Sequence, residues 1–183
     1  MLNYLFNPQS VAVIGASREP KKVGYAVLNN LVKFGYKGEI YPINPSAGDI
    51  LGRQAFPSVS AIGREVDLAV VSIPARSVAE SLKDCAKAKV KMAVVLSAGF
   101  KEVGHEGIKL EQEMLKIAAD NGIRIMGPNC LGVINTSNNM NASFAADMLA
   151  RGKTALFSQS GALGVAIMDW ACLLYTSPSP RDS

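Results

Sequence analysis

Val11-Ala-Val-Ile-Gly-Ala-Ser17 is the stretch that decides the fold of this 183-residue chain. Its apolar run breaks at Gly15, and after Arg18-Glu-Pro-Lys-Lys22 a helical pattern begins at about Gly24. A strand, a tight turn and a helix start in this order gather unpaired backbone N–H groups and the positive end of a helix dipole at one point. The stretch therefore predicts an anion-binding turn of the nucleotide type.

The glycine spacing of this turn argues against a dinucleotide ligand. A dinucleotide-binding turn reads G-x-G-x-x-G and is followed, about 20 residues later, by an acidic residue that binds the ribose. Here only Gly15 fits the spacing, and the second predicted strand ends in Asn44-Pro45. Three cations occupy residues 18–22. They suit a ligand with more phosphate charge than NAD, or they are solvated loop charges, and both interpretations stay open.

Composition places the chain among ordinary globular proteins. The formal net charge is +4, and the basic residues are spread along the chain without interleaved aromatics, which disfavours nucleic acid as a partner. The three cysteines have no metal-ligand or disulfide spacing, which is typical of reduced thiols. No apolar run approaches the ~20 residues of a membrane span, and the N-terminus does not resemble a signal peptide. We expect a soluble cytoplasmic protein without a metal site.

Strands and helices alternate over residues 1–132, which predicts a doubly wound parallel α/β sheet with right-handed crossovers. The predicted strands are apolar on consecutive residues, as in parallel sheets covered on both faces. They are residues 11–14, 39–43, 67–73, 92–96 and 123–126. The predicted helices begin near residue 24, at the capping-box spacing Ser77 to Glu80, and near residue 108.

Ligands of such sheets bind beyond the carboxyl ends of the strands. The residues that follow each predicted strand are small, rich in glycine or proline, and uncharged, so they would leave room for a flat, bulky ligand. They are Gly15-Ala16-Ser17, Asn44-Pro45, Pro74-Ala75, Ser97-Ala98-Gly99-Phe100 and Gly127-Pro128-Asn129.

A second unit is predicted to start after an Asn- and Ser-rich linker at residues 133–150. Thr154-Ala-Leu-Phe157 reads as a strand, and Ser158-Gln-Ser-Gly-Ala162 as the turn before a helix. This turn is no nucleophile elbow, because Ser158 stands where the leading glycine is needed. It predicts a second phosphate site at Ser158, Ser160 and Gly161. Residues 151–171 would be the incomplete start of a second domain, and residues 172–183 a non-native or disordered Ser/Pro tail.

Seven motifs together resemble the NDP-forming acyl-CoA synthetases, particularly the α part of ADP-forming acetyl-CoA synthetase and, more distantly, the α subunit of succinate–CoA ligase. The resemblance covers residues 3 to about 170, and order and spacing agree as well as residue type. The motifs are Ile14-Gly-Ala-Ser17, Val23-Gly24, Tyr41-Pro-Ile-Asn-Pro45, Ile73-Pro74, Ser97-Ala-Gly-Phe100, Gly127-Pro-Asn-Cys-Leu-Gly132 and Phe157-Ser-Gln-Ser-Gly-Ala162.

The resemblance implies a Rossmann-like CoA-binding domain at residues 1–132, followed by the truncated start of a flavodoxin-like domain. Its ligand residues carry over in three groups, with Asn129 at the last strand end. Gly15, Ala16, Ser17, Arg18 and Lys22 would hold the CoA phosphates, Asn44, Pro45 and Pro74 would flank the nucleotide, and Ser97, Ala98 and Gly99 would line the pantetheine arm. Asn44 agrees for a physical reason, because an acidic residue there would repel a ligand as rich in phosphate as coenzyme A.

The resemblance also implies an activity for the longer protein: acyl-CoA, ADP and phosphate interconvert with acid, CoA and ATP through a phosphohistidine that lies beyond this chain. The fragment would bind CoA and catalyse nothing. An ATP-grasp domain or β subunit would supply ATP or ADP with Mg²⁺, and the full protein would be an oligomer. Two alternatives are a ligand-sensing region of a protein lysine acetyltransferase and an NAD-dependent oxidoreductase, the latter disfavoured by the absent glycines and by Asn44.

Overall fold

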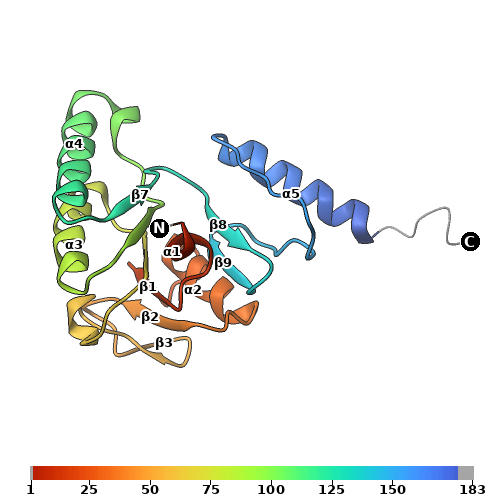
Figure 1. Cartoon of the computed structure of the whole chain (residues 1–183), viewed down its shortest axis with the longest axis horizontal. Coiled ribbons are helices and arrows are strands. Elements are labelled where there is room, and N and C mark those ends of the chain that lie inside the picture. Colours follow the sequence, from red (N-terminus) through yellow and green to blue (C-terminus); the bar gives the residue numbers. More distant parts are fainter. Residues whose placement is uncertain (1, 177–183) are drawn as a thin grey trace, which may run out of the picture.

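A computed structural model describes residues 2–176 and shows a sheet domain from which one helix extends (Figure 1). The sheet has five parallel strands in the order β2-β1-β5-β6-β7. All five predicted strands are confirmed, and the three central ones, β1, β5 and β6, are fully buried, as their continuous apolar runs indicate. Their bounds are β1 Ser10–Ile14, β2 Glu39–Ile43, β5 Leu68–Val71, β6 Met92–Val95 and β7 Arg124–Met126.

Helices cover both faces of this sheet, which confirms the doubly wound α/β class. Helix α2 (Val23–Lys33) packs on one face, and α3 (Ala75–Lys87) and α4 (His105–Asp120) lie side by side on the other (Figure 1). From β1 the chain adds β2 on one side, and it then returns past β1 to add β5, β6 and β7 on the other side. Right-handed crossovers that run in opposite directions along a sheet place their connecting helices on opposite faces. The strand order therefore reverses between β1 and β5, which is where such sheets bind ligands.

The polar stretch predicted as a linker at residues 133–150 is instead folded over most of its length. Strands β8 (Gly132–Asn135) and β9 (Met140–Ser143) form an antiparallel hairpin. Strand β9 packs on α2, and the short helix α1 (Asn3–Phe6) packs on β8. Two polar side chains of β9, Asn141 and Ser143, are buried because they bond each other: Ser143 Oγ donates to Asn141 Oδ1 at 2.6 Å. The linker prediction was wrong here, since composition does not show such internal pairing.

Two helix starts also differ from the sequence prediction. Helix α3 begins at Ala75 after Pro74, so Ser77 lies inside the helix, donates its own N–H to Pro74 O, and forms no capping box. Helix α4 begins at His105 rather than near residue 108, because its first residues, His105 and Glu106, are exposed and polar and show no apolar period. A short hairpin, β3 (Asp49–Ile50) with β4 (Arg53–Gln54), and the 3₁₀ turns η1 (Ser60–Ile62) and η2 (Lys101–Val103) were not predicted.

Helix α5 (Gly161–Thr176) extends away from the sheet domain (Figure 1). The strand predicted at residues 154–157 is not formed, since no strand of the described chain pairs with it. The tail predicted from residue 172 is helical up to Thr176, because residues 165–176 contain neither glycine nor proline. The rest of that predicted tail, residues 177–183, lies outside the described residues.

None of the helices described is both long enough and apolar enough to cross a lipid bilayer.

Candidate functional site

Gly15 lies where the ends of three neighbouring strands meet. Its N–H donates to Ile43 O at the end of β2, at 3.0 Å, and its φ of +87° is in the region that favours glycine. A Cβ atom here would stand 2.7 Å from Ser72 O, just after β5. The tight turn predicted from the sequence is therefore real, and no other residue fits it.

The N-terminus of α2 rests directly on this turn. A Cβ atom on Gly24 would lie 1.9 Å from Gly15 O, so only a glycine lets the helix approach this closely. The first turn of α2 holds no acidic residue, which leaves the positive end of its dipole uncompensated. Gly24 supplies the close helix–strand packing of the third glycine in a dinucleotide turn, but nine positions after Gly15 instead of five. Because of this different spacing, the G-x-G-x-x-G pattern does not reveal the packing role of Gly24.

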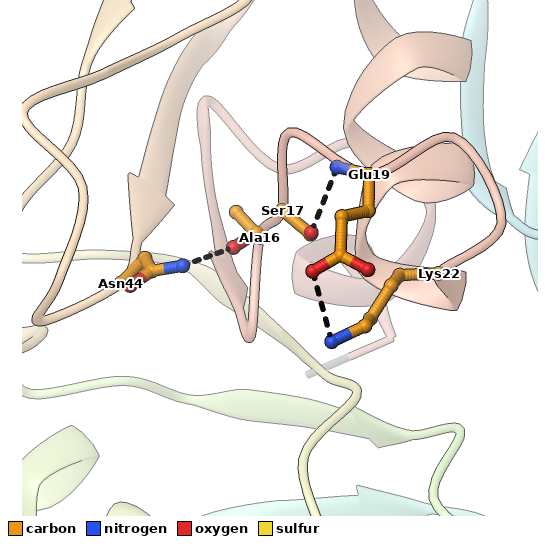
Figure 2. Close-up of polar contacts among 5 residues, drawn as sticks. All are labelled: Ala16, Ser17, Glu19, Lys22 and Asn44. Atoms are coloured by element: carbon orange, nitrogen blue, oxygen red, sulfur yellow. Dashed lines mark hydrogen bonds and ion pairs between the residues drawn. The ribbon is translucent and has the colours of Figure 1, made fainter.

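The cations of the turn are partly engaged with protein groups. Figure 2 shows Ser17 Oγ accepting the N–H of Glu19 at 3.0 Å and Lys22 Nζ paired with the Glu19 carboxylate at 3.2 Å. Arg18 Nε donates to Asp49 O in the β3–β4 hairpin at 2.7 Å. The Lys22 pair is well exposed, and such pairs are worth about 0–1 kcal/mol, so a phosphate could displace Glu19. Lys21 has no ion pair or hydrogen bond within residues 2–176.

Asn44 braces the turn rather than presenting its amide to a ligand. Its Nδ2 donates to Ala16 O at 2.8 Å (Figure 2), and its Oδ1 accepts the N–H of Ser46 at 2.8 Å. Both ends of the side chain are thus occupied by two adjacent strand-end loops. Pro45, the next residue, is exposed beside them.

A second helix N-terminus follows the end of β5. Pro74 is exposed and stands at the N-cap of α3, whose first turn again holds no acidic residue. Arg76, also exposed, lies in that first turn, and sequence reasoning missed it. The signal was available, because Arg76 is the first cation after the predicted strand-end residues Pro74-Ala75.

The loop after β6 is fixed by hydrogen bonds at both ends. Ser97 Oγ donates to Ile73 O at 2.6 Å, and Ser97 O accepts the N–H of Asn129 at 3.0 Å. The Gly99 N–H donates to the Glu102 carboxylate at 2.6 Å, which lowers the pKa of Glu102. Ala98, between them, is exposed. The hydroxyl of Ser97 and the N–H of Gly99 are therefore occupied by hydrogen bonds within the protein. A ligand at this loop would make van der Waals contacts rather than hydrogen bonds to these two donors.

Asn129 differs from the other strand-end residues in keeping its side chain available. It is exposed, its φ is +53°, and its amide makes no hydrogen bond within the described chain. The neighbouring Cys130 is half-buried, and burial raises the pKa of its thiol, so it is a packing group and not a thiolate.

The five strand ends thus form one continuous surface, here called the strand-end surface. It consists of residues 15–18, 44–45, 74–76, 97–99 and 127–129. Two hollows lie away from it. One, of about 250 Å³, is lined by Ser60, Gly63, Arg64, Glu65, Lys87, Ala88 and Lys89. The other, of about 430 Å³, lies beside edge strand β7 and is lined by Leu115, Ala118, Ala119, Gly122, Ile123, Arg124 and Ile125.

The second predicted phosphate site lies apart from these loops, at the start of α5. Ser160 Oγ accepts the N–H of Leu163 at 3.3 Å and so caps the helix, and Ser158 Oγ accepts the N–H of Ser160 at 3.1 Å. All three predicted residues, Ser158, Ser160 and Gly161, are exposed. Leu131 of the domain is the nearest side chain to this turn: its Cβ lies 3.8 Å from the place that a Cβ atom on Gly161 would take.

No group of three His, Cys, Asp or Glu residues within residues 2–176 is arranged to hold a metal ion.

Comparison with known proteins gives one family and several close relatives. The CoA binding domain family matches residues 9–136. The α subunit of acetate–CoA ligase [ADP-forming] I from Pyrococcus furiosus is 47% identical over 176 residues, which are 94% of this chain and 38% of that protein. The chain therefore spans about two fifths of the length of this relative.

Two solved structures share the fold closely. The crystal structure of PH0766 from Pyrococcus horikoshii has a TM-score of 0.91 at 44% identity, covering 96% of this chain and 40% of that one. The dinucleotide forming acetyl-coenzyme A synthetase 1 of Ca. Korarchaeum cryptofilum, in complex with phosphate and ADP, has a TM-score of 0.90 at 44% identity, covering 94% and 37%.

Proposed function

The chain belongs to the CoA binding domain family, and from this premise we propose that its strand-end surface binds coenzyme A. The observation that carries the proposal is the contact of Gly24 with Gly15, which presses the N-terminus of α2 onto the turn after β1. Together with the N-terminus of α3, this gives two helix ends without acidic first-turn residues next to the point where the strand order reverses. Such an arrangement favours a ligand with several phosphate charges.

The proposed roles follow the available groups. The turn Gly15, Ala16 and Ser17 gives backbone N–H groups to a phosphate, and Lys22, with its neighbour Lys21, gives charge once Glu19 is displaced. Arg18 and Asn44 act on the ligand indirectly, since they hold the β3–β4 hairpin and the Pro45 loop in place. Pro74 flanks the nucleotide, Ser97, Ala98 and Gly99 line the path of the pantetheine arm, and Asn129 donates or accepts with its free amide.

For the longer protein, we propose an NDP-forming acid–CoA ligase that interconverts acyl-CoA, ADP and phosphate with acid, CoA and ATP. The named relatives of this activity, at 44–47% identity, support it. The Ser158–Gly161 turn would hold the phosphate, and an ATP-grasp domain or β subunit would bring nucleotide and Mg²⁺. Leu163, Ile167 and Trp170 of α5 are 55%, 40% and 68% exposed, and such apolar surface is typical of a face that further protein covers.

The two alternatives receive no comparable support. Neither the ligase subunit nor the synthetase reported above is named as an acetyltransferase or an oxidoreductase. The structure also keeps Asn44, not an acid, at the end of β2, where an NAD-binding sheet places its ribose-binding carboxylate.

Calorimetric titration of the 183-residue chain with CoA, dephospho-CoA and NAD tests the proposal. We expect CoA to bind, dephospho-CoA to bind about tenfold or more weakly, and NAD not to bind, because hydrogen bonds to a charged phosphate are worth about 1.5–3 kcal/mol. Raising the salt concentration should weaken CoA binding, since the cations of the turn are exposed. Preference for NAD over CoA would refute the assignment.

A further inference from the structure

Asn30 is a buried polar residue in α2, 5% exposed. Its Nδ2 donates two hydrogen bonds, to Ser143 O at 2.9 Å and to Ala145 O at 2.7 Å. Ser143 ends β9 and Ala145 follows two residues later, so both carbonyls lie more than a hundred residues further along the chain. Because a buried carbonyl without a partner is costly, this one amide fastens the end of the hairpin to the helix.

The fastened segment is itself held together by its own side chains. Asn141 Nδ2 donates to Asp147 O at 3.1 Å, and Ser143 Oγ donates to Asn141 Oδ1 and accepts the N–H of Ala145 at 3.1 Å. Asn141 and Ser143 are fully buried. Residues 141–147 therefore move with α2 as one body.

This body reaches both predicted ligand sites. At one end, Gly24 of the same helix rests on the Gly15 turn. At the other, the N–H of Phe144, between the two bonded carbonyls, donates to Leu131 O at 3.4 Å, and Leu131 lies against the first turn of α5. A continuous set of packed and hydrogen-bonded groups thus runs from the turn after β1 to the start of α5.

We propose that Asn30 is a positioning residue that keeps the Ser158–Gly161 turn in register with the CoA-binding turn, so that CoA binding orders residues 148–164. The inference rests on the proposed function, because CoA is the ligand placed at the Gly15 turn. Asn30 acts through residues 143–145 and does not touch CoA. In the longer protein, this device would align the phosphate turn only when CoA is in place.

Amide hydrogen exchange of the 183-residue chain, with and without saturating CoA, tests the proposal. In the unmodified chain we expect CoA to slow exchange in residues 148–164 at least about fivefold, the lower end of measured couplings between sites. Asn30→Asp keeps the shape of the side chain but cannot donate to the two carbonyls. It should abolish that slowing while changing the Kd for CoA by less than about threefold, because the residue lies away from the ligand.

Two further variants make the result unambiguous. Asn29→Asp is the matched control, since Asn29 is the preceding residue of α2 and makes no side-chain hydrogen bond within residues 2–176; it should retain the slowing. Ser143→Ala leaves Asn30 intact but loosens Ala145 from the other side, and it should weaken the slowing even if Asn30→Asp fails to fold.

Three outcomes of the exchange experiment would overturn the proposed role of Asn30. A purely structural Asn30 would raise exchange equally with and without CoA and leave the difference intact, which would overturn the inference. CoA binding without any slowing in residues 148–164 of the unmodified chain would overturn it too, and would leave the proposed function standing. Absence of CoA binding would overturn the proposed function and the inference with it.

Discussion

Substituting Gly24 by alanine tests whether α2 must sit on the Gly15 turn. The added Cβ would start 1.9 Å from Gly15 O and 2.9 Å from Ser72 Oγ, and the first distance would have to open to 3.4 Å or more. Overpacking of this kind costs about 1–3 kcal/mol, and the better helix propensity of alanine returns at most about 1 kcal/mol. Because the clash is with a backbone oxygen, the upper end of the cost applies, and the expected net loss of about 2 kcal/mol corresponds to a Tm lower by roughly 4–8 °C for a chain of this size.

The same substitution should weaken CoA binding by about tenfold or more. Opening this contact moves the N-terminal N–H groups of α2 away from the phosphate, and a hydrogen bond to a charged group is worth about 1.5–3 kcal/mol. Thermal unfolding and calorimetric titration measure the two effects separately. Gly152→Ala is the control, since no atom lies within 4 Å of its Cβ position, and it should change neither quantity. An unchanged Tm for Gly24→Ala would refute the packing argument, and a lower Tm with unchanged CoA affinity would refute the placement of the ligand.

Asn44→Asp should weaken CoA binding by about tenfold or more in calorimetry, because it removes the donor to Ala16 O and adds a negative charge at the site. Asn44→Ala removes only the donor and should weaken binding less. A CoA affinity of Asn44→Asp equal to that of the unmodified chain would contradict the bracing role. The Gly99 N–H bond lowers the pKa of Glu102, so this bond stabilises the loop at pH values above the ordinary pKa of glutamate and is lost as pH falls through the lowered value. NMR of the Gly99 amide should show a transition below the ordinary pKa that is absent in Glu102→Gln. Burial raises the pKa of Cys85 to about 12, so mass spectrometry after thiol labelling at pH 8 should find Cys85 modified only when the chain unfolds.

The parallel sheet could be predicted because each central strand is a continuous apolar run. All residues of β1, β5 and β6 are buried, so these strands show an unbroken apolar run instead of the alternation of apolar and polar residues seen in a half-exposed strand. The strand-end loops were predicted for the same reason, since the end of each run marks the edge where a ligand binds.

The hairpin at residues 132–143 could not be predicted in this way. Asn141 and Ser143 are as buried as any valine of the sheet, yet they read as linker composition. Their burial depends on hydrogen bonds to Asp147 O and to each other, together with the amide of Asn30 in α2. Satisfaction of buried polar groups is a property of the assembled structure, and neither composition nor periodicity contains it.

At the site, the hydrogen bonds of the predicted residues could not be read from the sequence. Arg18 and Asn44 were assigned to the ligand, but their side chains bond Asp49 O and Ala16 O. Arg76 was not among the predicted residues, because the residues after that strand were selected as small and uncharged and Arg76 is the cation that directly follows them. Which side chains are free for a ligand follows from the hydrogen bonds each makes, and a sequence does not state these.

The buried hairpin also decides where this domain may be divided. The family match ends at residue 136, between β8 and β9, so a truncation there would leave β8 unpaired and strip Met140 and Ala142 from the side of α2. It would also leave the Asn30 amide without both of its acceptors. For protein engineering, we therefore propose that a module to be expressed, fused or exchanged should extend through Asp147, whose carbonyl accepts the hydrogen bond from the Asn141 amide.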